Sequence, residues 1–166
     1  MKNSFSMMLS FAFLFLLFAC NSADEMPTIE PEIDPEMENT NLAAITNVSF
    51  TQNGDTYNFS VEITSPDEGC NQYADWWEVV NLDGDLIYRR VLGHSHVNEQ
   101  PFTRSGGPVR VTETQEVWVR VHMNNTGYSM QGYQGSIANG FQASEIEEGF
   151  ASDLASVEPL PDGCAF

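Results

Sequence analysis

Histidine is scarce in this chain, and the placement of its three histidines is the first pattern that suggests chemistry. One residue separates His94 from His96, so in extended backbone their imidazoles point the same way. His122 lies in a second extended segment, and a loop folded over that segment would bring all three together. Three neutral imidazoles suit zinc or copper, with an open position for water or a ligand. The pattern predicts a metal site at His94, His96 and His122, with catalysis as an option.

The competing interpretation is that His94 and His96 are loop residues and that His122 is a surface residue. We favour it, because short motif matches carry a large false-positive rate. The sequence has no G-x-S-x-G elbow, no H-E-x-x-H pair and no phosphate-binding glycine loop. We therefore assign no catalytic residue, and we expect a protein that is not an enzyme.

The segment Gly93–Gly107 is dense in polar, planar and glycine residues. Binding groups are often found on loops that a rigid scaffold holds in place. Gln100 and Arg104 from this segment, with Trp118 and Arg120 from the following strand, are predicted to form a small-ligand or glycan surface. The alternative is that the segment's Pro-Phe pair fastens it to the core.

The three cysteines divide into one near the start of the chain and two within its later part. Leu17-Phe18-Ala19-Cys20 closes an apolar run that follows Lys2. The run is shorter than the roughly 20 residues of a membrane-spanning helix and has the order of a secretory signal. In the simplest interpretation this is an ordinary cleaved signal peptide, and Cys20 has no role of its own.

The Leu17–Cys20 segment also resembles the lipobox of bacterial lipoproteins, in which a peptidase cuts before a cysteine that becomes lipid-modified. We prefer this interpretation. The resemblance implies a mature chain that begins at Cys20 and is held at a membrane of the bacterial cell envelope by acyl chains such as palmitate. Asn21 follows the cysteine in place of Asp. By resemblance to the enterobacterial sorting rule, this implies the outer membrane.

Cys70 and Cys164 remain as an even pair once Cys20 is assigned to lipid. In an exported chain an even remainder indicates a disulfide, with two free thiols as the alternative. On the loop-entropy model this bond would contribute roughly 4–5 kcal/mol.

The net charge of −18 is unevenly distributed, because residues 21–43 and 145–166 contain acids and no base. Such a surplus argues against nucleic-acid binding, which requires a basic patch. Residues 27–38 repeat the pattern Pro-x-apolar-acid three times, which favours an extended tether. We predict a signal peptide over 1–19, an acidic, disordered, Pro-rich tether over 20–43, a folded domain over 44–144 and an acidic tail over 145–166.

From residue 44 onward the apolar residues recur with a period of two, which is typical of half-buried strands. Hairpin turns are predicted at Asn53-Gly54-Asp55 and at Leu82-Asp83-Gly84. Strands are predicted over 45–52, 57–63, 75–81, 85–92 and 117–123, with shorter candidates over 109–114 and 132–143. Residues 145–156 are predicted to form one or two helical turns. The pattern predicts an all-β, antiparallel β-sandwich with a disulfide-tied C-terminal tail.

The order of the strands over 44–144, and the run Val117–Asn124 followed by Asn125–Ser129, resemble a fibronectin type III or immunoglobulin-like module. In this register Met123 faces the core, while Trp118, Arg120 and His122 face solvent. Trp76 and Trp77 point to opposite faces, so we expect one in the core and the other exposed.

The leading functional hypothesis is a lipid-anchored binding or adhesion module of the cell envelope, with no catalysis and an unknown protein or glycan as ligand. A zinc- or copper-binding protein and a structural subunit of an envelope complex are the alternatives.

Overall fold

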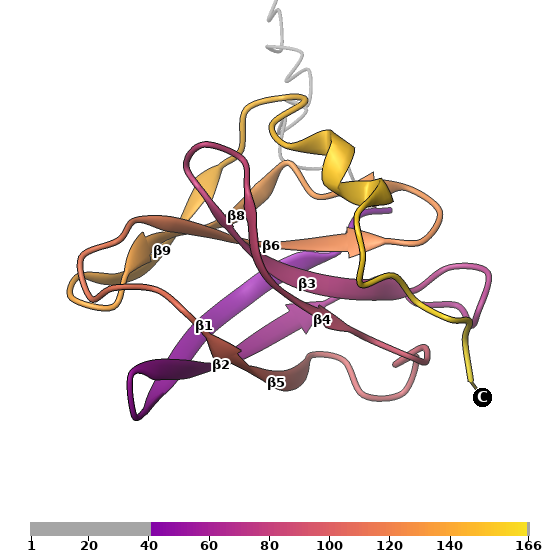
Figure 1. Ribbon diagram of the computed structural model, residues 1–166. Helices are drawn as coiled ribbons and strands as arrows, with labels where there is room; N and C mark the ends of the chain where they lie inside the picture. The colour runs from indigo at the N-terminus through magenta and orange to yellow at the C-terminus, as the bar shows by residue number, and fades with distance from the viewer. Residues whose placement is uncertain (1–40, 166) are drawn as a thin grey trace, which may run out of the picture. The chain divides into compact units, whose positions relative to one another are not determined.

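The computed structural model describes residues 41–165 (Figure 1). The predicted signal peptide, Cys20 and most of the tether lie outside these residues. The strands are β1 Ala44–Asn53, β2 Thr56–Thr64, β3 Ala74–Asn81, β4 Leu86–Val91, β5 Phe102–Val109, β6 Val117–Met123, β7 Gly127–Tyr128, β8 Gln131–Ser136 and β9 Gly140–Glu145. A 3-10 helix follows at Ser152–Ser156. Within the described residues, no helix has the length and hydrophobicity to cross a membrane.

The strands form two antiparallel sheets, so the predicted all-β class is confirmed. One sheet has the order β1-β2-β5, and the other has the order β4-β3-β6-β8-β9, with β7 also paired to β6. Both predicted hairpins are present. Gly54 turns between β1 and β2 with φ 61, and Gly84 turns between β3 and β4 with φ 92. Glycine adopts these left-handed angles without steric cost.

The core lies between the two sheets, and β6 shows how the sequence produces it. Val117, Val119, Val121 and Met123 are all fully buried and pack in one apolar cluster. Phe59 and Trp77 join them from β2 and β3. The predicted inward direction of Met123 is therefore correct, and the other residues of β6 point to the outer face of the six-stranded sheet.

Strand β5 lies where the sequence predicted mostly loop. It begins at Phe102 and ends at Val109, so the short strand predicted over 109–114 was wrong. Phe102 and Val109 are buried, and the strand pairs with β2 from Ile63 to Tyr57. Two glycines and a proline inside β5 interrupt the alternation of apolar and polar residues, so the sequence pattern does not indicate a strand there. A Cβ at Gly106 would lie 2.5 Å from the Tyr88 hydroxyl, so the packing there requires glycine.

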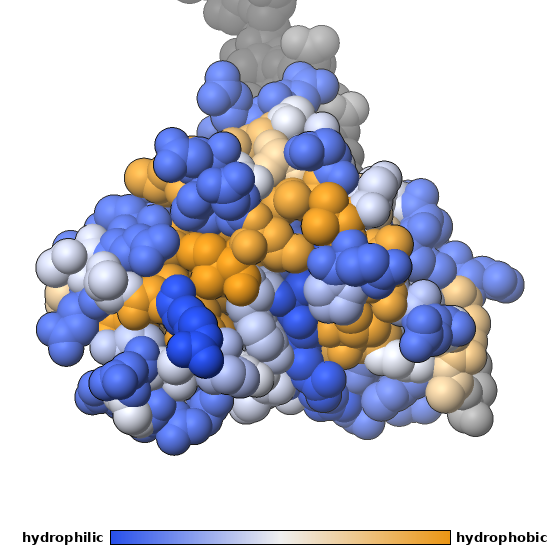
Figure 2. Space-filling view, viewed as in Figure 1, coloured by the Kyte–Doolittle hydropathy of each residue, from blue (hydrophilic) through white to orange (hydrophobic). Residues whose placement is uncertain are grey.

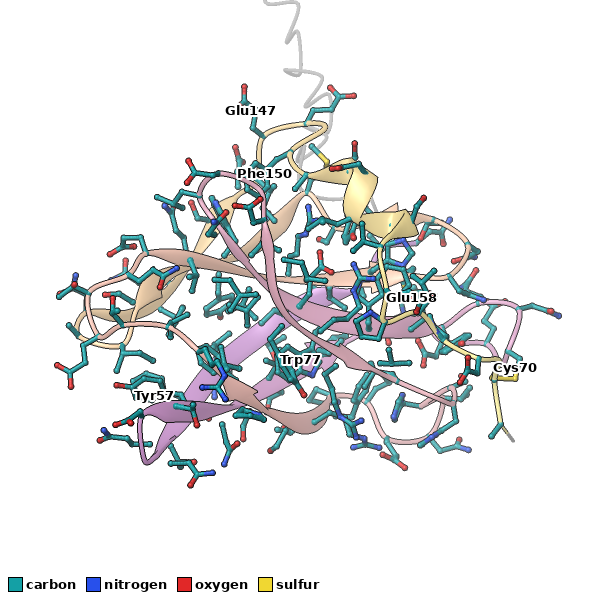
Figure 3. The ribbon with its side chains drawn as sticks, viewed as in Figure 1. Tyr57, Cys70, Trp77, Glu147, Phe150 and Glu158 are labelled. Carbon is teal, nitrogen blue, oxygen red and sulfur yellow. A yellow bond between two sulfur atoms is a disulfide. The ribbon has the colours of Figure 1, made fainter. Side chains whose placement is uncertain are left out.

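The chain after β9 crosses the outer face of the six-stranded sheet, and we call residues 146–165 the strap (Figure 1, yellow). It contains the 3-10 helix, where the sequence predicted one or two helical turns. The predicted disulfide is present and joins Cys164 to Cys70. The backbone N–H of Ala165 also donates to the Gly93 carbonyl at 2.7 Å. At its first residue, the backbone N–H of Ile146 donates to the Met130 carbonyl at 2.7 Å, so the strap is fastened at both ends. Figure 3 shows its course from Glu147 to the disulfide at Cys70.

Candidate functional site

The outer face of the six-stranded sheet has two parts. The covered half, beneath the strap, comprises Trp76, Glu78, Arg89, Arg120 and His122. The open half, on β6, β8, β9 and the residues next to them, comprises Glu116, Trp118, Gln134, Asn139, Gln142 and Ser144. In Figure 2 apolar side chains gather across the middle of the visible surface, over β4 and the strap, with polar side chains around them.

Glu78 is the centre of the covered half. It is completely buried and lies directly opposite Arg89 on β4 and Arg120 on β6. Its two carboxylate oxygens accept from the Arg89 and Arg120 Nε atoms at 2.7 and 2.8 Å. One carboxylate between two guanidiniums leaves a positive charge that needs further acceptors.

The strap supplies those acceptors through its main chain. Arg120 donates to two strap carbonyls at 2.7 and 2.8 Å, and Arg89 donates to three others. The accepting residues are Phe150, Ala151, Leu154, Val157 and Pro159. The two arginines therefore bind the strap by its backbone, whatever its side chains are.

Aromatic rings enclose the same guanidiniums. The Arg120 guanidinium lies 3.7 Å from the centre of the Tyr128 ring, and that of Arg89 lies 4.4 Å from the Trp76 ring. Such contacts are favourable, and more so without water. Burial, with a smaller effect from the Glu78 charge, raises the pKa of Tyr128 to about 12. Tyr128 is therefore neutral at physiological pH.

Next to this cluster, Asp75 holds His122. The two side chains are joined at 2.7 Å between Oδ1 and Nδ1, and the His122 ring is stacked on Trp76 at 3.7 Å. Burial raises the pKa of Asp75, while its bond to His122 acts in the opposite direction. A pocket of about 500 Å³ separates this pair from the end of the strap, including Cys164.

The prediction that this face of the sheet is exposed to solvent was wrong, because the strap covers it. Arg120 is 1% exposed and His122 is 9% exposed, although both were expected to face solvent. The second tryptophan was also expected at the surface, but Trp76 is 3% exposed. The alternation on β3 and β6 correctly separated the core face from the outer face. It could not reveal that a later segment covers the outer one.

The other two histidines lie together in the loop before β5. The ring centres of His94 and His96 are 4.4 Å apart, and His96 is stacked on Phe102 at 3.8 Å. His96 is buried, and neither of its ring nitrogens has a hydrogen-bond partner among residues 41–165. Burial lowers the pKa of His96 to about 4, with a smaller contribution from the positive charge of Arg104.

The structure therefore pairs His94 with His96 and places His122 against Asp75 instead. Over residues 41–165, no three or more His, Cys, Asp or Glu side chains are grouped so as to hold a metal ion. The predicted zinc or copper site is not assembled from these three histidines in the described part of the chain.

Gln100 and Arg104 do not form one surface with Trp118 and Arg120. The Gln100 amide ties its loop to the end of β2, because it accepts from the Ser65 backbone N–H at 2.9 Å and donates to the His96 carbonyl at 3.1 Å. Arg104 is on β5, in the three-stranded sheet, whereas Trp118 and Arg120 are on β6 in the other sheet. Arg104 forms an ion pair with Glu99 at 2.6 Å.

Of the predicted ligand residues, Trp118 alone belongs to the open half. It is partly exposed, and its ring centre lies 6.4 Å from that of Phe150 in the strap. Trp118 pairs directly with Gln134 on β8, which in turn pairs with Gln142 on β9. Residues directly opposite each other in a sheet share a face, so the three side chains form a row.

Gln134 and Gln142 of this row line a hollow of about 380 Å³ at the β8–β9 turn, and Trp118 stands outside that lining. The polar lining of the hollow consists of Glu116, Gln134, Asn139, Gln142 and Ser144. Within residues 41–165, the side chains of these five make no hydrogen bond to another residue. Their donors and acceptors are free to meet a ligand.

Several of these residues were missed by the sequence reasoning, although signals for them existed. The β3–β4 hairpin turn was predicted, and its register places Glu78 opposite Arg89. In β8 and β9 an inward aromatic precedes an outward glutamine, as Tyr133-Gln134 and Phe141-Gln142. That repeated pair predicts a hairpin with two glutamines on one face.

Fold and site together define an all-β domain of two antiparallel sheets, tied by a disulfide, with a polar hollow on one outer face. The chain is 35% identical over 136 residues to a protein of Halomicrobium mukohataei named "Putative lipoprotein". The aligned part covers 76% of this chain and 64% of that relative, so the chain spans less than two thirds of the relative's length. The relative's name agrees with the lipoprotein predicted from Leu17–Cys20. No family model and no solved structure matches the chain.

Proposed function

We propose that this chain is a lipid-anchored protein of the bacterial cell envelope whose domain recognises an envelope ligand without catalysis. The anchor would be Cys20, and Asn21 after it favours the outer membrane. The relative's name supports the lipoprotein part of the proposal. The division of strands between the sheets, β1-β2-β5 against β4-β3-β6-β8-β9, supports a sandwich of the immunoglobulin or fibronectin type III kind.

The observation that carries the recognition role is the open half itself. Its polar side chains line a hollow and lack hydrogen-bond partners within the described domain. Gln134, Gln142 and Ser144 stand on the paired strands β8 and β9, while Glu116 and Asn139 lie just outside the strands. Small-ligand sites are concave, and a few well-placed polar groups in them fix the orientation of the ligand. Such a set held on a rigid sheet is pre-organised, which reduces the entropy cost of binding.

Co-sedimentation with envelope fragments from the organism that encodes the chain tests this function. The full-length protein in detergent micelles is expected to pellet with the fragments in a saturable manner. The double variant Gln134→Ala/Gln142→Ala is expected to bind at least about tenfold more weakly, since each lost polar contact costs about 1 kcal/mol. The matched variant Gln52→Ala/Gln131→Ala changes two exposed glutamines outside the hollow. Equal binding by both variants would refute the open half as the ligand face.

A further inference from the structure

We infer that the ligand of the open half is a neutral glycan, bound by the Trp118-Gln134-Gln142 row and the polar rim of the hollow. This inference rests on the proposed recognition function and specifies its ligand class.

The hydrogen-bonding chemistry of the hollow is the first argument. Gln134, Gln142 and Asn139 carry amides, and Ser144 carries a hydroxyl. Each of these groups both donates and accepts hydrogen bonds. A sugar hydroxyl also does both, so every one of these side chains can bind it in either direction. A purely accepting ligand, such as a phosphate, would leave half of this capacity unused.

The charge of the hollow is the second argument. Among its lining residues Glu116 carries the sole charge, which is negative. The nearest arginine along β6 is Arg120, whose Nε, Nη1 and Nη2 are bonded to Glu78 and the strap. An anionic polymer would therefore meet repulsion here without a compensating cation. The hollow favours an uncharged ligand over a sulfated, phosphorylated or carboxylated one.

Trp118 also supports a glycan as the ligand. It stands at the end of the glutamine row, partly exposed, and Phe150 of the strap lies beside it. A sugar ring has an apolar C–H face as well as hydroxyls, and a tryptophan offers it a flat apolar surface with little conformational entropy to lose. The ring supplies the dispersion contact, and the amides fix the orientation of the ligand.

Bare backbone forms part of the hollow and lets a ligand come close. A Cβ at Gly135 would collide with the carbonyl of Gly140 across the hairpin. Only glycine fits at this position, so β8 and β9 approach each other tightly at their turn. The paired side chains of Gln134 and Gln142 start about 5 Å apart, close enough for one sugar unit to contact both.

The test uses the full-length protein in micelles and two treatments of the same envelope fragments. Periodate cleaves the vicinal diols of glycans, whereas protease digestion removes proteins and leaves glycans in place. We expect periodate to abolish co-sedimentation and protease to leave it unchanged. Trp118→Ala is expected to weaken binding about tenfold or more, and Trp118→Phe less. Circular dichroism and unfolding midpoints establish that each variant is folded.

A protein ligand, an anionic ligand and the absence of a ligand would each give a different result in this co-sedimentation assay. Binding that survives periodate and is lost after protease would overturn the glycan and leave a protein-recognition module. Binding that heparin competes for more strongly than neutral dextran, and that 1 M salt removes, would overturn the neutral ligand. Absence of any envelope binding would refute the proposed function itself.

Discussion

Glu78 determines whether the covered half can exist, because it is the carboxylate between two buried guanidiniums. Replacing it with glutamine keeps the shape but leaves both cations without a counter-charge. Removing one partner from a buried ion pair costs about 3–5 kcal/mol. We expect Glu78→Gln to lower the free energy of unfolding by this amount in urea denaturation. Exposed Glu113→Gln is the control and should change it by less than about 0.5 kcal/mol. A loss for Glu78→Gln as small as that of the control would show that the cluster contributes little to stability.

His96 makes the stability of the domain depend on pH. Its pKa is about 4 in the folded protein, below the ordinary value of 6.5. Between these values the unfolded chain binds a proton that the folded chain does not. The free energy of unfolding should therefore fall as pH decreases from 6.5 to 4, by at most about 1.4 kcal/mol per pH unit.

His96→Phe is expected to remove this pH-dependent contribution while keeping a ring stacked on Phe102. Urea denaturation at several pH values between 4 and 7 measures it. His94→Phe, at the exposed neighbouring histidine, should keep most of the slope of the wild type, because the charge of His94 contributes less than burial to lowering the pKa of His96. An unchanged slope in His96→Phe would mean that the ring is not held neutral.

At the scale of elements, the strap should loosen in stages because two kinds of contact hold it. The disulfide fastens its far end, at a sequence separation of 94 residues, while arginines hold its main chain between 150 and 159. Loop-entropy arguments give a stabilisation of roughly 4–5 kcal/mol for such a bond.

We expect Cys70→Ser/Cys164→Ser to lower the free energy of unfolding by up to that amount. Hydrogen exchange should show early loss of protection at the Ala165 amide, which bonds to Gly93, and retained protection at the Ile146 amide, which bonds to Met130. Simultaneous loss at both sites would show that the strap detaches as one unit.

The elements differ in how far sequence reasoning could reach. The structure confirms three predictions that rest on local patterns. The strand Val117–Met123 follows from the alternation of apolar and polar residues, and the hairpin turns follow from the placement of glycine. The disulfide follows from the even number of cysteines that remain after Cys20. Strand β5 was missed because its pattern is set by packing against β2 and Tyr88, not by its own composition. The open half required knowledge that β6, β8 and β9 are adjacent, which is a long-range property.

The covered half was the least predictable, because the strap meets it through backbone carbonyls. Arg89 and Arg120 bind backbone carbonyls, which every residue has, so no side-chain pattern in residues 146–165 indicates the contact. The convergence of His94, His96 and His122 was likewise a three-dimensional hypothesis. The pairing of His122 with Asp75 could not be read from their spacing.

For the whole molecule, the proposed anchor predicts where the protein is found in cells. Cys20→Ala should move it from the membrane fraction to the soluble fraction, because acyl chains contribute about 0.8 kcal/mol per buried CH₂. Immunoblotting of fractionated cells and metabolic labelling with a palmitate analogue measure the change. Cys70→Ser/Cys164→Ser, which keeps Cys20, should leave the protein in the membrane fraction. Label on a Cys20→Ala chain would contradict the anchor.

The strap also sets the order in which this domain can mature. Residues 146–165 are made after all nine strands of the described domain, yet they supply the carbonyls that Arg89 and Arg120 need and the sulfur that Cys70 needs. Until they emerge, a nascent chain can pair its strands but must keep two guanidiniums and a carboxylate in water. The strap can therefore cover the sheet only after the strands of the sandwich have been synthesised. A chain that ended before residue 146 would therefore leave Arg89, Arg120 and Glu78 uncovered on the outer face of the sheet.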